Sequence, residues 1–188
     1  MGFTRRQLEA FRDASVPDLV GDGLKLLFVG INPGLWTAAT RTHFAHPGNR
    51  FYPALRLAGI IERDIDRSEG MTDADRAHLV QRGVGITNLV NRATVRASEL
   101  ERSELIEGGR RLQERMATLN PAVVAVAGVT AYRDAFRARK AAIGRQPVEW
   151  NGAAVWVVPN PSGLNAHETV ETLAEWYGAA GREAGIIP

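Results

Sequence analysis

The sequence predicts one three-layer α/β/α domain with a mainly four-stranded parallel sheet. Four short apolar runs, at 26–29, 84–90, 122–127 and 154–158, have the length and composition of strands buried on both faces. Stretches with helical spacing separate these runs, which favours right-handed crossovers and a parallel sheet. No repeat or linker interrupts the 188 residues. We therefore expect a single domain at 1–188, with a peripheral helix within 1–16 and a core at 17–180.

The expected helix bounds follow from capping residues, from prolines that end helices and from the spacing of apolar residues. Asn49 is placed to cap one helix, and Ser103 with the acidic residue after it is typical of a helix start. Pro121 ends that helix before the third strand. We expect helices at 4–14, 49–58, 72–82, from 98 or 103 to 119, at 128–139 and at 167–180. The expected connections are loops at 17–23 and 37–47, a charged stretch at 62–70 and a turn at 150–152.

Composition excludes several classes of protein. The chain is 45% hydrophobic and 23% charged, has no cysteine and carries a formal charge of +2. It therefore has no disulfide, thiol nucleophile or thiolate metal site. No apolar run approaches the ~20 residues that span a bilayer, and the first residues lack the apolar segment of a signal peptide. We expect a cytoplasmic protein without membrane association, whose weak charge permits nucleic-acid binding without arguing for it.

Common cofactor and hydrolase motifs are missing. The chain has no G-x-G-x-x-G after a strand, no phosphate-binding P-loop and no G-x-S-x-G elbow. Of its four histidines only His43 and His46 are close in sequence, without acidic neighbours, so we expect no metal site. His46 either orders its loop or touches a phosphate. We expect no cofactor.

Two polar turns follow parallel strands and should face one crevice, because ligands bind at the carboxyl ends of such strands. The first encloses Asn32 between glycines and a proline at 30–34, and the second spans 160–165. Asn91 follows the second strand at the same edge. An asparagine amide can orient a water molecule or bond to an amide-like heterocycle. The alternative is that these residues only shape turns. Phe44 is likewise either a core plug or a stacking surface.

Three separated motifs resemble the mismatch-specific uracil-DNA glycosylases, the family of bacterial Mug and the thymine-DNA glycosylases. They are GINPG at 30–34, FAHPGNRFY at 44–52 and NPSGL at 160–164. Intermediate stretches fit too, among them GVGITNLV at 83–90 and Thr94. The resemblance runs from about Pro17 to Tyr177 and implies the fold of that family.

The resemblance implies a monofunctional hydrolase that cleaves the N-glycosidic bond of uracil, and of ethenocytosine or other modified pyrimidines, in G·U-type mismatches. Asn32 would position the water, with Asn91 as a secondary catalytic candidate. No lysine lies in the motifs, as expected when no Schiff base forms. Phe44 would stack on the base. The substrate-binding residues implied are Gly30, Ile31, Pro33, Gly34, Thr37, Phe44, His46 and Asn88.

The implied partner is double-stranded DNA, bound by a monomer that flips the damaged nucleotide out of the helix. Leu164 would fill the vacated space, and Gly163 and Asn165 would contact the guanine left opposite. Backbone amides near 160–163 and after Gly128 would hold phosphates. The implied DNA-binding residues are Asn160, Pro161, Ser162, Gly163, Leu164, Asn165, Gly128 and Thr130.

Departures from the family pattern leave parts of this interpretation open. Asn91 stands where relatives carry an acidic residue, and Ala166 where bacterial relatives can carry an arginine. Trp36 and Thr37, beside the pocket, leave open whether a thymine methyl is admitted. Two alternatives are a non-catalytic protein that binds damaged DNA and a nucleoside or nucleobase hydrolase that uses the same crevice.

Overall fold

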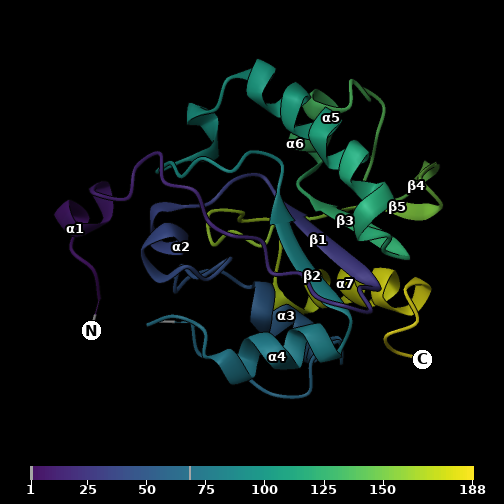
Figure 1. The fold of residues 1–188 in the computed structure, drawn as a ribbon, viewed down its shortest axis with the longest axis horizontal. Coiled ribbons are helices and arrows are strands. Elements are labelled where there is room, and N and C mark those ends of the chain that lie inside the picture. Colours follow the sequence, from purple (N-terminus) through teal and green to yellow (C-terminus); the bar gives the residue numbers. More distant parts are fainter. Residues whose placement is uncertain (1, 68) are drawn as a thin grey trace.

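A computed structural model describes residues 2–67 and 69–188 as one α/β domain built on a five-stranded sheet (Figure 1). The strand order is β2-β1-β3-β5-β4. Four strands are parallel: β1 (Leu26–Gly30), β2 (Val84–Asn88), β3 (Val123–Ala127) and β5 (Ala153–Val158). The predicted fold class is confirmed, but the expected count of four strands is wrong by one.

The strand missed by sequence reasoning is β4 (Gly144–Trp150), which pairs antiparallel with β5 at the edge of the sheet. It contains Pro147 and is mostly exposed, so it lacks the apolar run that marks the other strands. Proline is tolerated there because an edge strand has one side without ladder bonds. The expected turn before β5 is present: Asn151 and Gly152 have φ of 52° and 82°, as a two-residue type I′ hairpin requires.

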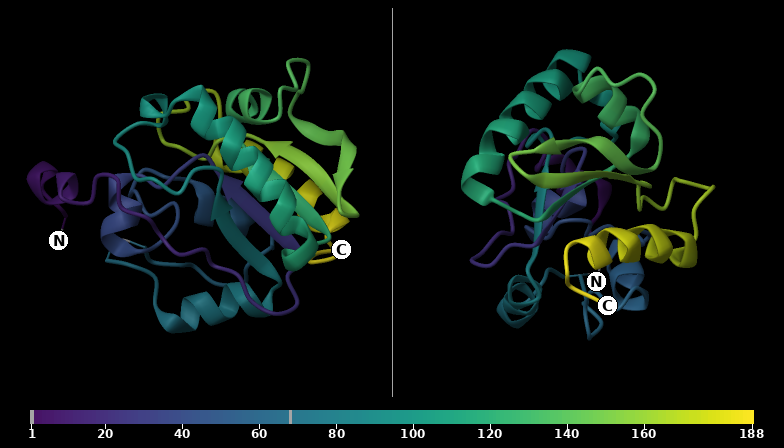
Figure 2. Two further views of the ribbon diagram at one scale, coloured as in Figure 1. Left: turned by 45° about the horizontal axis from the view of Figure 1, so that its top comes forward. Right: turned by 90° about the vertical axis from the view of Figure 1, so that its right-hand side faces the viewer.

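Helices cover both faces of the sheet, as its buried central strands require (Figure 2). One face carries α3 (Phe51–Leu57), α4 (Asp73–Gln81) and α7 (Val170–Glu183), and the other carries α5 (Arg102–Leu119) and α6 (Val129–Ala135). Alternate residues of β1 point to opposite cores: Leu26 and Phe28 to the first, Leu27 and Val29 to the second.

Several expected elements differ in extent. The N-terminal helix is shorter than 4–14: α1 (Arg5–Glu9) begins at a capping box of Thr4 and Gln7, lies at the edge of the domain (Figure 1) and contacts α2. The expected loop at 37–47 overlaps α2 (Leu35–Thr40), which is too short to show helical periodicity in the sequence. A 3-10 turn, η1 (Ala97–Glu99), precedes α5. The connection expected at 62–70 includes Ser68, which lies outside the described residues.

The four parallel strands end at the same edge of the sheet, which we call the carboxyl edge. The polar segments after β1, β2, β3 and β5 therefore meet there. A small third apolar cluster, built from Val16, Leu35, Ala38 and Ala93, lies beside them. Within the described part of the chain, no helix is long and apolar enough to cross a membrane.

Candidate active site

Asn32 follows β1 at the carboxyl edge, and hydrogen bonds fix the orientation of its amide. The Nδ2 atom lies 2.8 Å from the Arg92 carbonyl oxygen, 2.8 Å from Thr94 Oγ1 and 3.2 Å from the Pro33 carbonyl oxygen. An amide nitrogen is a donor and these oxygens can accept, so the nitrogen must occupy this end. Asn32 Oδ1 has no hydrogen-bond partner among the residues at 2–67 and 69–188. It is available to accept a hydrogen bond from water.

Residues after β2 form hydrogen bonds both to Asn32 and to the turn that contains it. Thr94 Oγ1 donates to the Arg96 carbonyl at 2.8 Å, so its lone pairs remain for Asn32. The Thr94 amide donates to the Pro33 carbonyl at 3.1 Å, and Gly34 pairs with Thr94 in an isolated parallel bridge. The 30–34 turn and the residues after β2 therefore form one hydrogen-bonded unit, in which Pro33 and Gly34 serve as backbone.

A narrow contact between Gly30, Asn88 and Phe44 lies next to this unit. A Cβ atom at Gly30 would fall 2.5 Å from Asn88 Oδ1 and 3.3 Å from Phe44 Cζ. No real side chain tolerates the first distance, so glycine is required by close approach. The contact brings together three residues that were predicted to bind the base.

His43 orients the amide of Asn88. Its Nε2 lies 3.0 Å from the Pro17 carbonyl oxygen, which can only accept, so Nε2 carries the hydrogen. Burial is the largest influence on His43 and lowers its pKa, which keeps the ring neutral at pH 7. Nδ1 then accepts from Asn88 Nδ2 at 3.3 Å. Asn88 Oδ1 is consequently turned toward Gly30 and Phe44 as an acceptor.

Phe44 is half-buried with a φ of 56°, and its ring stacks on Phe51 with centroids 4.1 Å apart. The contact with Phe51 supports the core alternative, and the ring also borders Gly30. Stacking of a base on Phe44 stays a prediction. His46 Nδ1 accepts from the Gly48 amide at 3.1 Å, which orders its loop. Thr37 is buried within α2. Beside it, Trp36 Nε1 is buried without a hydrogen-bond partner in the part of the chain that the structure describes.

The 160–165 turn is held by its own side chains. Asn160 Oδ1 accepts from the Ser162 amide at 3.0 Å, and Asn165 Nδ2 donates to the Asn160 carbonyl at 3.1 Å. The Leu164 amide bonds to Ser162 Oγ at 3.3 Å. These bonds occupy one end of each asparagine amide within the turn, and Asn165 Oδ1 accepts from the His167 amide just beyond it. The Leu164 side chain, in contrast, is 87% exposed at the tip of the turn.

Arg50 ties this turn to the 44–52 motif. Its guanidinium donates to the carbonyl oxygens of Ser162 and Asn165, each at 2.8 Å, and to that of Glu168. The Arg50 amide donates to the Pro161 carbonyl at 3.0 Å. A Cβ at Gly163 would lie 2.6 Å from the Gly48 carbonyl oxygen, so the two loops are in backbone contact.

The start of α6 completes the carboxyl edge. Gly128 has a φ of 110°, and a Cβ there would lie 3.5 Å from Ile31 Cδ1 and 3.9 Å from Asn160 Nδ2. Thr130 is exposed in the first turn of α6. Ile31 of the 30–34 turn, Gly128 at the start of α6 and Asn160 of the 160–165 turn therefore lie side by side. Their positions after parallel strands predicted this arrangement.

Asn91 is placed differently from Asn32. Its Oδ1 accepts from the Val16 amide at 2.8 Å, and its Nδ2 donates to the Val16 carbonyl at 3.0 Å. Both ends of the amide thus bind the backbone of one residue. This pairing favours a structural role, and we do not assign Asn91 a direct part in chemistry.

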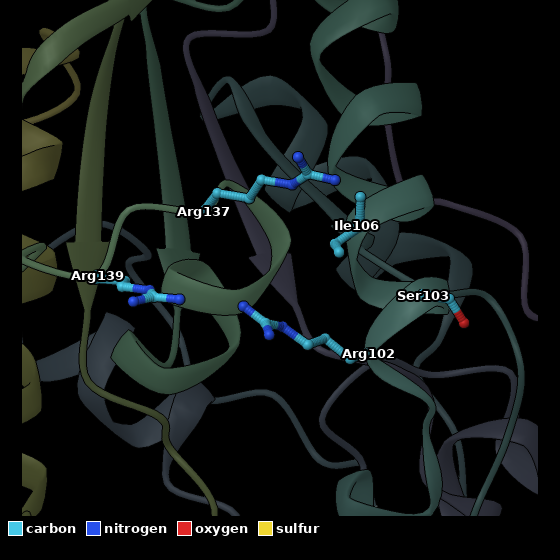
Figure 3. A pocket seen from close by; sticks show the side chains of 5 residues that line it. All are labelled: Arg102, Ser103, Ile106, Arg137 and Arg139. Carbon is cyan, nitrogen blue, oxygen red and sulfur yellow. The ribbon is translucent and has the colours of Figure 1, made fainter.

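Two cavities lie away from these residues. One, of about 400 Å³, lies between the start of α5 and the end of α6 (Figure 3). In it Arg102 and Arg139 point toward each other, while Arg137 extends toward Ile106. The other, of about 490 Å³, borders α4 near Arg76 and Val80. Neither is lined by a residue of the predicted site.

Sequence reasoning missed the residues that position others. It gave no role to Thr94, His43 or Arg50, although Thr94 and Arg50 lie in the motifs that carried the resemblance. Their partners are distant in sequence, so no local spacing revealed them. Among the described residues, no three His, Asp or Glu side chains are grouped so that they could hold a metal ion.

Comparisons with known proteins agree with this arrangement. A family model described as "Uracil DNA glycosylase superfamily" matches residues 17–179. A solution NMR structure described as a "putative Uracil DNA glycosylase" from Methanosarcina acetivorans superposes with a TM-score of 0.61. The match covers 91% of this chain and 97% of that one at 17% identity. At this identity the likeness shows a shared fold.

Proposed function

The chain belongs to the uracil DNA glycosylase superfamily, and from this we propose that it hydrolyses the N-glycosidic bond of uracil in mismatched duplex DNA. The observation that carries the proposal is the fixed amide of Asn32 at the carboxyl edge. Its free Oδ1 can accept a hydrogen bond from a water molecule and thereby direct a lone pair of that water outward. A neutral amide cannot act as a general base, so the proposal requires a reaction in which the glycosidic bond breaks first.

In the proposed reaction, the bond between C1′ and the uracil nitrogen lengthens, and its electron pair leaves with the base. The water held by Asn32 then adds to the oxocarbenium-like sugar and loses a proton to solvent, and the departed uracil anion takes up a proton from solvent. The products are uracil and an abasic site. Neither of the chain's two lysines, Lys25 and Lys140, lies in the site motifs, which supports hydrolysis without a Schiff base.

Asn88 and Phe44 supply a proposed means of reading the base. Asn88 Oδ1 faces Gly30 as an acceptor because His43 holds its Nδ2. A uracil ring placed on Phe44 could donate its N3–H to that oxygen. Cytosine has an acceptor at the same ring position, so it would leave two acceptors face to face. The geometry thus supports selection of uracil over cytosine.

Leu164 supports a duplex substrate over a free nucleoside. Its side chain is almost fully exposed on a turn that Arg50 and internal hydrogen bonds hold rigid. An exposed leucine on a rigid turn is suited to insertion into a base stack, as apolar wedges are in other proteins that distort DNA. A nucleoside hydrolase has no use for such a residue.

The test uses a labelled duplex with a single G·U pair, incubated with purified protein in EDTA and then treated with alkali. We expect strand cleavage only after alkali, which reports an abasic site. Matched A·U and G·C duplexes measure mismatch and base selectivity. Binding of the G·U duplex without cleavage would favour a non-catalytic damage sensor. Absence of both binding and cleavage would contradict the DNA-repair assignment.

A further inference from the structure

Residues 13–16 run alongside the segment that holds Asn32. The Asp13 amide donates to the Ala93 carbonyl, and the Ala93 amide donates to the Ala14 carbonyl, each at 2.9 Å. The two Asn91 bonds to Val16 extend this pairing. Four hydrogen bonds therefore join residues 13–16, which we call the arm, to residues 91–94, which we call the support loop.

Apolar contacts seat the arm against both parts of the site. Val16 is 1% exposed and belongs to the third apolar cluster with Ala93 of the support loop and Leu35 and Ala38 of α2. Helix α2 begins directly after the turn that contains Asn32. Leu8, Phe11 and Ala14 pack against the same cluster. The arm thus contacts elements on either side of Asn32.

Ion pairs hold the side chain of Arg92, the residue whose backbone carbonyl binds Asn32. The Arg92 guanidinium bonds to both carboxylate oxygens of Glu104, each at 2.9 Å, and to Asp13 Oδ1 at 2.9 Å. The hydrogen bond from Arg92 lowers the pKa of Glu104 to about 2. Arg92 is therefore fixed between the arm and α5 while its carbonyl accepts from Asn32 Nδ2.

We propose that the arm braces the support loop and that Asn91 is a positioning residue for Asn32. The inference rests on the proposed function of Asn32. Asn91 fixes the support loop through Val16, and the loop presents the Arg92 carbonyl and the Thr94 hydroxyl that orient the Asn32 amide. The arm lies before residue 17, where the family match begins, whereas the support loop lies within the matched residues.

The two hydrogen bonds between the Asn91 side chain and the Val16 backbone explain why residue 91 carries an amide. Val16 presents one donor and one acceptor to it, and an asparagine side chain matches both. An aspartate would accept from the Val16 amide but would place its second oxygen against the Val16 carbonyl. Asn91→Asp should therefore weaken the attachment of residue 91 to Val16, even though the two side chains have nearly the same shape.

The test compares Asn91→Ala and Asn91→Asp in the full-length chain with Asn120→Ala as the control. Asn120 has a φ of 45° at the far end of α5, so alanine there lowers stability without touching the support loop. We expect Asn91→Ala to lower the single-turnover excision rate by roughly tenfold to a hundredfold, as a small misplacement of a catalytic group does. Asn91→Asp should fall between Asn91→Ala and the wild type. Affinity for a duplex whose uracil nucleotide carries a cleavage-resistant 2′-fluoro group should be unchanged.

A double-mutant cycle separates positioning from general destabilisation. If Asn91 acts through Asn32, adding Asn91→Ala to Asn32→Ala should cause no further loss of rate. Multiplied losses, an unchanged rate in Asn91→Ala, or an equal loss in Asn120→Ala would each overturn the proposal.

Hydrogen exchange tests the contact between the arm and the support loop without any substrate. The Ala93 and Thr94 amides, which bond to Ala14 and Pro33, should exchange faster in Asn91→Ala than in Asn120→Ala. Unchanged exchange at both amides would overturn the brace. If the wild type does not excise uracil, the exchange measurement still decides the brace, whereas the excision assay decides the proposed function.

Discussion

The amide of Asn32 donates to the Thr94 hydroxyl across 2.8 Å, and that hydroxyl donates onward to the Arg96 carbonyl. Because the Thr94 hydroxyl uses its one hydrogen for the Arg96 carbonyl, it can only accept from Asn32. The orientation of the proposed catalytic amide is therefore determined by a residue 62 positions away in the chain.

Replacing Asn32 removes the proposed water ligand and leaves the rest of the crevice. We expect Asn32→Ala to bind a G·U duplex normally and to excise uracil roughly a hundredfold to a thousandfold more slowly, as when one aligned catalytic hydrogen bond is lost. Single-turnover kinetics and a binding titration measure the two effects. Normal excision would contradict the assigned role, and lost binding would point to structural damage.

Thr94 offers a finer test, since valine has nearly its shape without the hydroxyl. Thr94→Val should slow excision about fivefold, equivalent to one hydrogen bond of ~1 kcal/mol, while Thr94→Ser should stay close to the wild type. The measurement is the single-turnover rate for each variant at saturating protein. Equal rates for valine and serine would show that the hydroxyl does not orient Asn32.

Gly30 has no room for a side chain. In Gly30→Ala the new methyl would displace Asn88 or Phe44, because their nearest atoms lie 2.5 Å and 3.3 Å from its position. We expect weaker binding of uracil-containing duplex and a lower thermal midpoint. Gly34→Ala is the comparison for stability, because a Cβ there meets nothing within 4 Å and the backbone φ of −77° suits alanine. A Gly30→Ala protein as stable and as tightly binding as the wild type would contradict this geometry.

Leu164 should matter for duplex substrates and not for folding. With 87% of its side chain exposed, Leu164→Ala should leave the thermal midpoint unchanged, since little apolar area is lost from the core. Excision from duplex DNA should fall about tenfold or more if the wedge stabilises the flipped state, where unstacking a base costs a few kcal/mol. Leu57→Ala, at a residue 57% exposed on α3, is the matched control. Equal behaviour of the two variants would remove the wedge from the mechanism.

The buried ring of His43 predicts how stability depends on pH. Burial lowers its pKa below the ordinary 6.5, against the opposing influence of the Pro17 carbonyl and Asp18 and together with Arg76. The unfolded chain therefore takes up a proton first, so the contribution of His43 is complete above about pH 6.5 and is lost as the pH falls toward its folded-state pKa.

Thermal midpoints measured between about pH 8 and pH 5 should consequently fall more steeply for the wild type than for His43→Gln. Glutamine keeps a donor for the Pro17 carbonyl without a group that titrates in this range. His78, whose pKa is also lowered, is present in both proteins and cancels in the comparison. Parallel curves would show that His43 does not supply the effect.

Local pattern was sufficient for the strands of the core. The runs that became β1, β2, β3 and β5 are apolar because both faces of the sheet are covered. Chain order then placed the turns at 30–34 and 160–165 on one edge, which the contact between Gly128, Ile31 and Asn160 confirms. Edge strand β4 and the short helix α2 were missed, since an exposed strand with a proline and a six-residue helix carry no clear periodicity.

The sequence by itself determined the α/β class, the carboxyl edge and the residue types gathered there, because burial and chain connectivity act on contiguous segments. Only the tertiary structure decided how the side chains are oriented. Asn32 meets Arg92 and Thr94, Asn88 meets His43, and Asn91 meets Val16, over separations of 45 to 75 residues. A hydrogen bond depends on the position of its partner in space, and no local pattern records that position.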